Sequence, residues 1–174
     1  MTAQVSRLES QIATDYGEMG TALVGQPNVD AGQAWSFGTI VLCVSAPGTA
    51  TITDVSFKEP TGGMHVDAFA TRQSPIRIGG QFLGADTKTL ADVGDGFIIG
   101  GAPIEDQCPT AADDATWVGG VELGIQVSKS TSAMARANAL EVTYETDGSR
   151  MSLTIPFGIA LCAVGTSGMC PAPS

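Results

Sequence analysis

The sequence predicts an all-β fold, an antiparallel β-sandwich with a flexible N-terminal arm and one long loop insertion. Short apolar segments recur from Trp35 onward, and turns rich in Gly and Pro separate them. The 22 glycines fit a chain with many turns, and no segment alternates a strand with a long helix. Hydrophobic residues make up 43% of the 174 residues and charged residues 15%, which favours one folded domain with a sizeable core.

The first 33 residues are predicted to form a flexible arm that precedes a single domain at 34–174. A short amphipathic helix is expected over 4–13, because Val5, Leu8 and Ile12 would share one side of it. The stretch 17–32 mixes Gly, Pro, Asn and Asp, which is typical of a linker.

Eight strands are expected in the domain, each a short apolar or alternating run that ends at a turn signal. They cover 37–44, 49–57, 64–70, 76–83, 96–100, 120–128, 140–145 and 150–161. The region 84–118 is rich in Asp, Gly and Ala, and we expect it to be a loop insertion around the short strand at 96–100. Long loops in compact domains are often functional, so a specific binding surface is expected there.

The hairpin at 139–155 is predicted down to its register. Asp147 and Gly148 favour a two-residue type I′ turn, which fixes every pair of facing residues. The expected apolar pairs are Tyr144 with Met151, Val142 with Leu153 and Leu140 with Ile155. The expected polar pairs are Glu145 with Arg150, Thr143 with Ser152 and Glu141 with Thr154. Pro156 has no N–H, so the strand beyond it is expected at a sheet edge or a bulge, and such an edge offers a route to self-association.

Over residues 35–162 the predicted architecture resembles an immunoglobulin-like sandwich of roughly seven or eight strands. The resemblance is one of architecture. The Cys…Trp…Cys spacing of antibody domains is missing, because no Trp lies between Cys43 and Cys108.

The four cysteines are an even, dispersed set without a C-x-x-C pair, which favours two disulfides over a metal cluster. They are Cys43, Cys108, Cys162 and Cys170. Cys162 and Cys170 flank a short loop, so pairing them, and Cys43 with Cys108, is slightly favoured. The alternative joins Cys43 to Cys162, because the segments 37–43 and 157–162 have similar patterns and could lie side by side.

Disulfides persist in oxidising compartments, so we expect an extracytoplasmic protein, secreted or at the cell surface. The segment 1–7 leads into polar residues and not into an apolar leader core, so the leader or anchor is expected to be absent from this chain. No apolar run reaches the length of a membrane span. A net charge of −10 with only eight basic residues argues against nucleic acid and anionic membranes as partners.

His65 is the only histidine, and it lies two residues before Asp67. On a strand these two side chains share one face, while Met64 points to the other, so an exposed His65–Asp67 contact is expected. A serine hydrolase would also need a nucleophile elbow, which is absent, and a cupredoxin-type copper site needs a second histidine. The sequence therefore assigns no catalytic residue, no cofactor-binding residue and no cofactor.

Calcium is the one metal that the sequence leaves open, because hard cations bind carboxylate oxygens in Gly-rich loops. The candidate ligands are Asp92, Asp95, Glu105 and Asp106, with Asp113 and Asp114 in the same region. The EF-hand pattern is not met, and Asp and Gly also dominate ordinary turns.

These observations predict a non-catalytic binding or structural module at the cell surface or envelope, with a protein or cell-envelope partner. The alternative is a ligand-binding module for a glycan or a divalent cation such as calcium, through the loops of 84–118. Trp35 and Trp117 could provide a stacking surface for a glycan, but each is rather expected to fill the core or cover a sheet edge.

Overall fold

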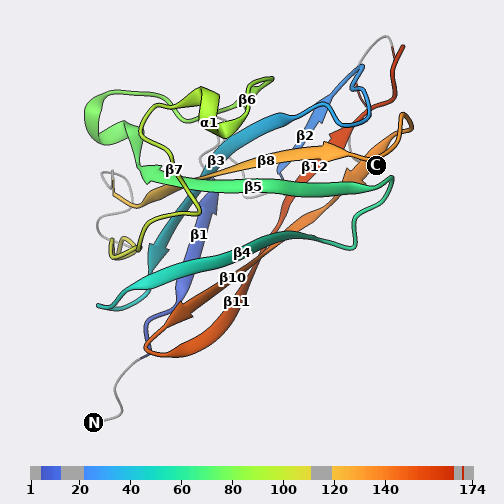
Figure 1. The fold of residues 1–174 in the computed structure, drawn as a ribbon. Helices are drawn as coiled ribbons and strands as arrows, with labels where there is room; N and C mark the ends of the chain where they lie inside the picture. The colour runs from blue at the N-terminus through green and yellow to red at the C-terminus, as the bar shows by residue number, and fades with distance from the viewer. Residues whose placement is uncertain (1–4, 13–21, 111–118, 167–169, 171–174) are drawn as a thin grey trace.

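The computed structural model describes residues 5–12, 22–110, 119–166 and 170, and its regular structure is almost entirely β (Figure 1). The strands are β1 (Leu8–Ile12), β2 (Ala22–Gln26), β3 (Trp35–Val44), β4 (Ala50–Lys58), β5 (Met64–Gln73), β6 (Ala85–Asp86), β7 (Ile98–Ile99), β8 (Val121–Lys129), β9 (Ala135–Ala137), β10 (Ala139–Thr146), β11 (Ser149–Ile155) and β12 (Phe157–Leu161). The helical segments are the 3-10 turn η1 (Pro75–Ile78) and the single-turn α1 (Leu90–Val93). None of the helical segments in the described residues is long and apolar enough to cross a membrane.

Three sheets share one hydrophobic core. The largest sheet has the strand order β1-β3-β8-β5-β7, with β6 paired to β3. The other two have the orders β11-β10-β4 and β2-β12-β9. Among the strands that the structure describes, every pairing is antiparallel except that of β12 with β2, which is parallel. One cluster of buried side chains, including Phe37 and Ile125 of the largest sheet and Tyr144 and Phe157 of the other two, joins all three sheets.

The two smaller sheets are built on one long ribbon that runs from β9 and β10 to β11 and β12 (Figure 1). Its β10–β11 half has the predicted register, with Tyr144 opposite Met151 and Glu145 opposite Arg150, so the hairpin prediction is confirmed at all six pairs. The ribbon breaks at Asn138 on one strand and Pro156 on the other, where the chain passes from one sheet to the next.

The prediction that the strand beyond Pro156 lies at an edge or a bulge is wrong. Pro156 itself lies outside the strands, where its missing N–H interrupts no ladder. The chain after it, β12, is a central strand with β2 on one side and β9 on the other. The edge lies before Pro156, because β11 pairs only with β10 among the described strands. Self-association through that edge stays a prediction.

The largest sheet is buried on both faces. Along β3 and β8 nearly every side chain is buried, whichever way it points. One face packs on the two smaller sheets, and segments of residues 75–100 lie over the other face (Figure 1). This double cover explains why the sequence shows near-continuous apolar runs here and not a clean alternation.

The predicted helix over 4–13 is wrong for the part that the structure describes, since Leu8–Ile12 form β1 and pair with β3. Ser6 and Leu8 are both buried, an alternation that suits an edge strand. The Leu8 N–H donates to the hydroxyl of Tyr144 on the facing sheet (3.1 Å). Two segments of the predicted arm therefore belong to sheets: β1 pairs with β3, and β2 pairs with β12.

Two of the predicted strands are wrong or shortened. The strand at 76–83 is absent: Pro75 starts the 3-10 turn η1, and Gly79 ends it in the left-handed region (φ 71°), a conformation that favours glycine. The strand at 96–100 is reduced to the two residues of β7. The other six are confirmed within a few residues, as β3, β4, β5, β8, β10 and the pair β11 and β12.

Both disulfides follow the favoured pairing. Cys43 on β3 is joined to Cys108, and Cys162 after β12 is joined to Cys170. The alternative bond between Cys43 and Cys162 is therefore excluded. A Cβ on Gly25 of β2 would lie only 3.1 Å from Cys170 Cβ, so the second disulfide packs directly on this glycine. Two disulfides are typical of proteins from an oxidising environment.

Lys129 at the end of β8 is fully buried. Its Nζ donates to the carbonyl oxygens of Ala133 (2.7 Å), Cys162 (3.1 Å) and Ser132 (3.3 Å). Burial lowers the pKa of Lys129, and the charge of Asp30 partly offsets this effect. The buried ammonium ties the loop after β8 to the second disulfide.

We expect wild-type stability, relative to a Lys129→Met variant, to rise with pH in the alkaline range. The folded-state pKa of Lys129 is lowered, and its ordinary value is 10.5. Between these two pKa values the unfolded chain binds the proton more often than the folded chain. The free energy of unfolding therefore rises with pH in this range. Below the folded-state pKa both states are protonated, and this residue contributes no slope.

Urea unfolding of both proteins from neutral pH to the ordinary lysine pKa measures this difference. Lys58→Met, at an exposed position on β4, is the matched control and should show no such rise. If the free energy of unfolding of the wild type, relative to that of Lys129→Met, stays constant or falls with pH, the expectation is contradicted.

Candidate binding site

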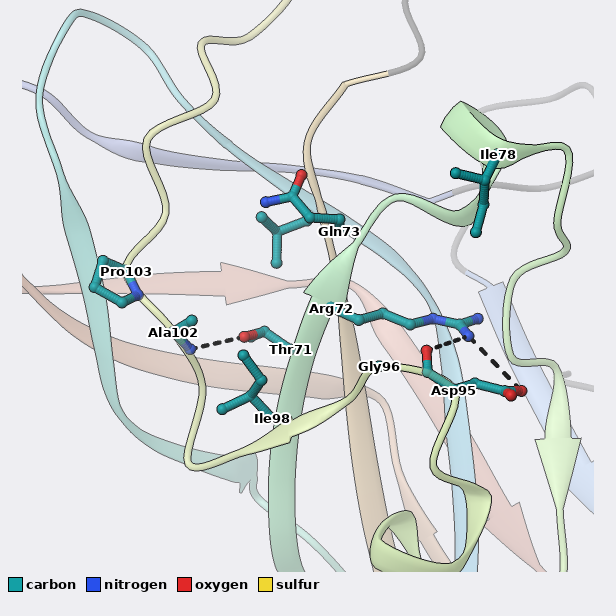
Figure 2. A pocket seen from close by; sticks show the side chains of 10 residues that line it. Thr71, Arg72, Gln73, Ile78, Asp95, Gly96, Ile98, Ala102 and Pro103 are labelled. Carbon is teal, nitrogen blue, oxygen red and sulfur yellow. Dashed lines mark hydrogen bonds and ion pairs between the residues drawn. The ribbon is translucent and has the colours of Figure 1, made fainter.

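A cavity of about 310 Å³ opens at the end of β5, beside the edge strand β7 (Figure 2). Its apolar lining is Ile78, Ile98, Ala102, Pro103 and Val121. Its polar lining is Thr71, Arg72, Gln73 and Asp95, with the backbone at Gly96. The volume is at the small end of ligand sites and suits one large side chain or a small group.

Arg72 holds the wall of this cavity together. Its Nε donates to Glu122 Oε2 (2.6 Å), Nη2 to the Gln81 carbonyl (3.0 Å) and Nη1 to the Asp95 carbonyl (3.2 Å). The guanidinium carbon also lies 4.5 Å from the centre of the Phe97 ring, a cation–π distance. One side chain of the sheet therefore contacts the loops at Gln81 and at Asp95, and Figure 2 shows its contacts with Asp95.

Glu122 is the fully buried partner of Arg72. Its second oxygen, Oε1, accepts from the backbone N–H groups of Leu83 (2.7 Å) and Thr39 (3.1 Å). Thr39 lies at a bulge of β3 with a φ of 72°, which is strained for a β-branched residue. A Cβ on the neighbouring Gly38 would collide with Glu122 Oε1, so the bulge is shaped around this carboxylate.

The loop that carries the cavity wall also packs on the sheet through apolar groups. Gly124 of β8 leaves room for it, since a Cβ there would lie 2.8 Å from Phe97 and 2.9 Å from Leu90. The Leu90 N–H donates to Gln126 Oε1 (3.1 Å), and the Ala102 N–H donates to Thr71 Oγ1 (2.9 Å). The cavity is thus preformed by contacts to the strands.

Four exposed isoleucines lie on η1 and β7, and two of them, Ile78 and Ile98, line the cavity. Ile76 is 41% exposed, Ile78 88%, and Ile98 and Ile99 are each 53% exposed. We call these four residues the isoleucine rim. Single exposed apolar residues are normal, but four large ones on two segments that line one cavity mark an interaction surface.

The predicted calcium ligands are engaged in separate local contacts. Asp92 Oδ2 accepts from Thr89 Oγ1, and Asp95 lies beside Arg72. Glu105 accepts from Thr49, while Asp106 pairs with Arg77 (2.7 Å) and accepts from the Gly120 N–H. No three His, Cys, Asp or Glu side chains come together as a metal site within the described residues. Asp113, Asp114 and Trp117 lie outside those residues, and calcium binding stays a prediction.

Trp35, the other residue considered for glycan stacking, is only partly exposed. It lies at the start of β3, and its ring stacks on the buried Phe37 with 6.4 Å between ring centres. Its ring therefore serves the core of the fold.

His65 and Asp67 form the expected contact on the outer side of β5, with 3.0 Å between His65 Nε2 and Asp67 Oδ1. Met64 is buried, as predicted. Ser128 of β8 joins them: its Oγ lies 3.1 Å from His65 Nε2 and donates to Asp67 Oδ1 (3.0 Å). The other ring nitrogen, Nδ1, faces the Gly63 carbonyl (2.9 Å).

This cluster differs from a catalytic triad. In a triad the carboxylate and the serine take opposite nitrogens of the ring, so that the histidine can pass a proton. Here Asp67 and Ser128 share Nε2, and a backbone carbonyl takes Nδ1. The contact fits a stabilising role at a bulge, since β5 shifts register against β8 between Val66 and Ala68.

Arg72, Glu122 and Ser128 were missed from the sequence. Glu122 stands inside the apolar run of β8, and a charge in a buried strand requires a partner, which is the signal that would have found it. Its partner lies on β5, and the pairing of β5 with β8 is not visible in the sequence. The same pairing places Ser128 opposite His65.

The sequence matches no family model and no curated protein.

Proposed function

We propose that this protein is a non-catalytic, extracytoplasmic binding module with an immunoglobulin-like β-sandwich, and that it binds a partner protein which places one side chain in the cavity beside Arg72. The single observation that carries the proposal is the preformed cavity with two exposed isoleucines of the isoleucine rim, Ile78 and Ile98, in its lining. Exposed isoleucines lose water when a partner covers them, which drives association.

The rigidity of the site supports a binding role. Arg72 and Glu122 fix the loops before binding, so little conformational entropy is lost when a partner docks. The two disulfides support an oxidising location outside the cytoplasm. The antiparallel sheets around one core support the immunoglobulin-like architecture, from which the parallel β2–β12 pair departs.

The test is to select binders from a random displayed peptide library on the wild-type protein and then to measure them on single variants. Ile78→Asp and Ile98→Asp alter the rim at exposed positions and should leave folding intact. We expect the selected peptides to lose about tenfold or more in affinity on both, because a buried apolar contact is replaced by a desolvated charge.

The matched control is Val164→Asp. Val164 is 50% exposed and follows β12, which belongs to another sheet than β7, and it does not line the cavity. Peptides that bind the wild type and all three variants equally well would overturn the proposed site, as would a library that yields no binder.

A further inference from the structure

We infer that the partner presents a basic segment with an apolar side chain, a Lys- or Arg-flanked apolar residue that enters the cavity. This inference rests on the proposed function and adds the chemistry of the partner. The cavity and the rim supply the apolar half of the recognition, and the carboxylates around them supply the charge.

The basic residues at the cavity are already neutralised. Arg72 lies between the buried Glu122 and the exposed carboxylate of Asp95, so this group of three carries one excess negative charge. Arg77, between two isoleucines of the rim, pairs with Asp106. Among the described residues at the cavity, Arg72 and Arg77 are thus both paired with carboxylates, which does not favour an acidic ligand.

The acidic residues are in excess around the same loops. Asp92 and Asp95 precede Gly96 of the cavity wall, and Glu105 follows Pro103 by two residues. All three are exposed, and within the described residues Asp92 and Glu105 form no ion pair. The whole chain, with these residues included, has a net charge of −10, which favours the approach of cations over anions.

The same charge argues against a second copy of this chain as the occupant. Two copies that met through this surface would bring their carboxylates together, each on a chain of net charge −10. Like charges across an interface oppose association, whereas a basic partner gains from them.

The probes are labelled synthetic peptides that share one apolar pair and differ in charge: Lys-Lys-Leu-Ile-Lys-Lys, Gln-Gln-Leu-Ile-Gln-Gln, Glu-Glu-Leu-Ile-Glu-Glu and Lys-Lys-Gly-Ser-Lys-Lys. Fluorescence anisotropy measures their affinity for the intact protein at low and at physiological ionic strength. We expect the basic apolar peptide to bind about tenfold or more tightly than the neutral one, and the gap to shrink with salt.

Ile98→Asp separates recognition from plain charge attraction, because it adds a negative charge while removing an apolar contact. Plain attraction predicts that the variant binds the basic apolar peptide more tightly. Recognition in the cavity predicts a loss of about tenfold. Asp95→Asn and Glu105→Gln should each weaken binding about two- to fivefold, and Glu145→Gln, exposed on β10, should not.

Several results would overturn the inference. The first two are that the basic apolar peptide binds no more tightly than the neutral apolar peptide, or no more tightly than the basic peptide that lacks Leu-Ile. The other two are that the basic apolar peptide binds Ile98→Asp more tightly than the wild type, or that the protein sediments as a dimer that Ile78→Asp dissociates. Library peptides that depend on the rim but lack Lys and Arg would sink this inference alone and leave the proposed function standing. Library peptides that ignore the rim would sink both.

Discussion

Replacing Glu122 with Leu is expected to cost about 3–5 kcal/mol of unfolding free energy, the usual price of removing one member of a buried ion pair. Glu122 is fully buried, and the Arg72 side chain is only 9% exposed. The substitution leaves the guanidinium without its closest carboxylate and leaves the N–H groups of Thr39 and Leu83 without an acceptor. Urea unfolding at neutral pH measures the loss.

Two further variants keep this prediction testable if Glu122→Leu does not fold. Glu122→Gln keeps an oxygen that can accept from the two N–H groups, so it should lose less free energy of unfolding than Glu122→Leu. The double variant Arg72→Met with Glu122→Leu should be more stable than Glu122→Leu alone, because an apolar pair leaves no buried charge. Glu145→Leu, at an exposed position, should change stability by about 0.5 kcal/mol or less. A Glu122→Leu cost under about 1 kcal/mol would contradict the structural role assigned to the pair.

The two disulfides are expected to contribute unequally to stability. Cys43 and Cys108 are 65 residues apart in the sequence, and Cys162 and Cys170 are 8 apart. The chain-entropy model gives about 4 kcal/mol for the longer loop and about 2.5 kcal/mol for the shorter one, because the longer bond removes more freedom from the unfolded chain. Replacing both cysteines of each bond with Ala in turn, and comparing urea unfolding, measures the two contributions.

The two double variants act as controls for one another, since each leaves the other bond in place. Mass spectrometry should first show that one disulfide remains in each variant. A larger loss from the Cys162–Cys170 pair would mean that its contacts with Gly25 and β2 outweigh the loop-length effect. Equal losses would also contradict the expected order.

The sequence predicted the fold where local signals agreed with one another. The β10–β11 register followed from one Asp-Gly turn and a strict alternation, and no distant partner was needed to fix it. The segment 76–83 looked equally apolar, but Ile76 and Ile78 are both exposed and Ile78 lines the cavity, so hydrophobicity there reflects a surface and not a strand.

The candidate site was hidden because it depends on pairs far apart in the sequence. The sequence predicted a binding surface within 84–118, and residues 95, 96, 98, 102 and 103 of that region line the cavity, whose binding role stays a prediction. Arg72, Glu122 and Leu83, however, meet only once β5 lies beside β8 and β3 forms its bulge. The segment 8–12 was wrongly predicted as a helix for a related reason, since it pairs with β3 and the Leu8 N–H bonds to Tyr144, two partners that are far away in the sequence.

The parallel pairing of β2 with β12 has a consequence for the order in which the chain assembles. As the chain emerges from its N-terminus, β2 appears early, but its partner strand is the last one of the described fold. β2 can join its sheet only after β12 forms, so this pairing spans most of the described chain, and such non-local contacts slow folding. The disulfide between Cys162 and Cys170 packs on Gly25 of β2 and therefore covers this late pairing.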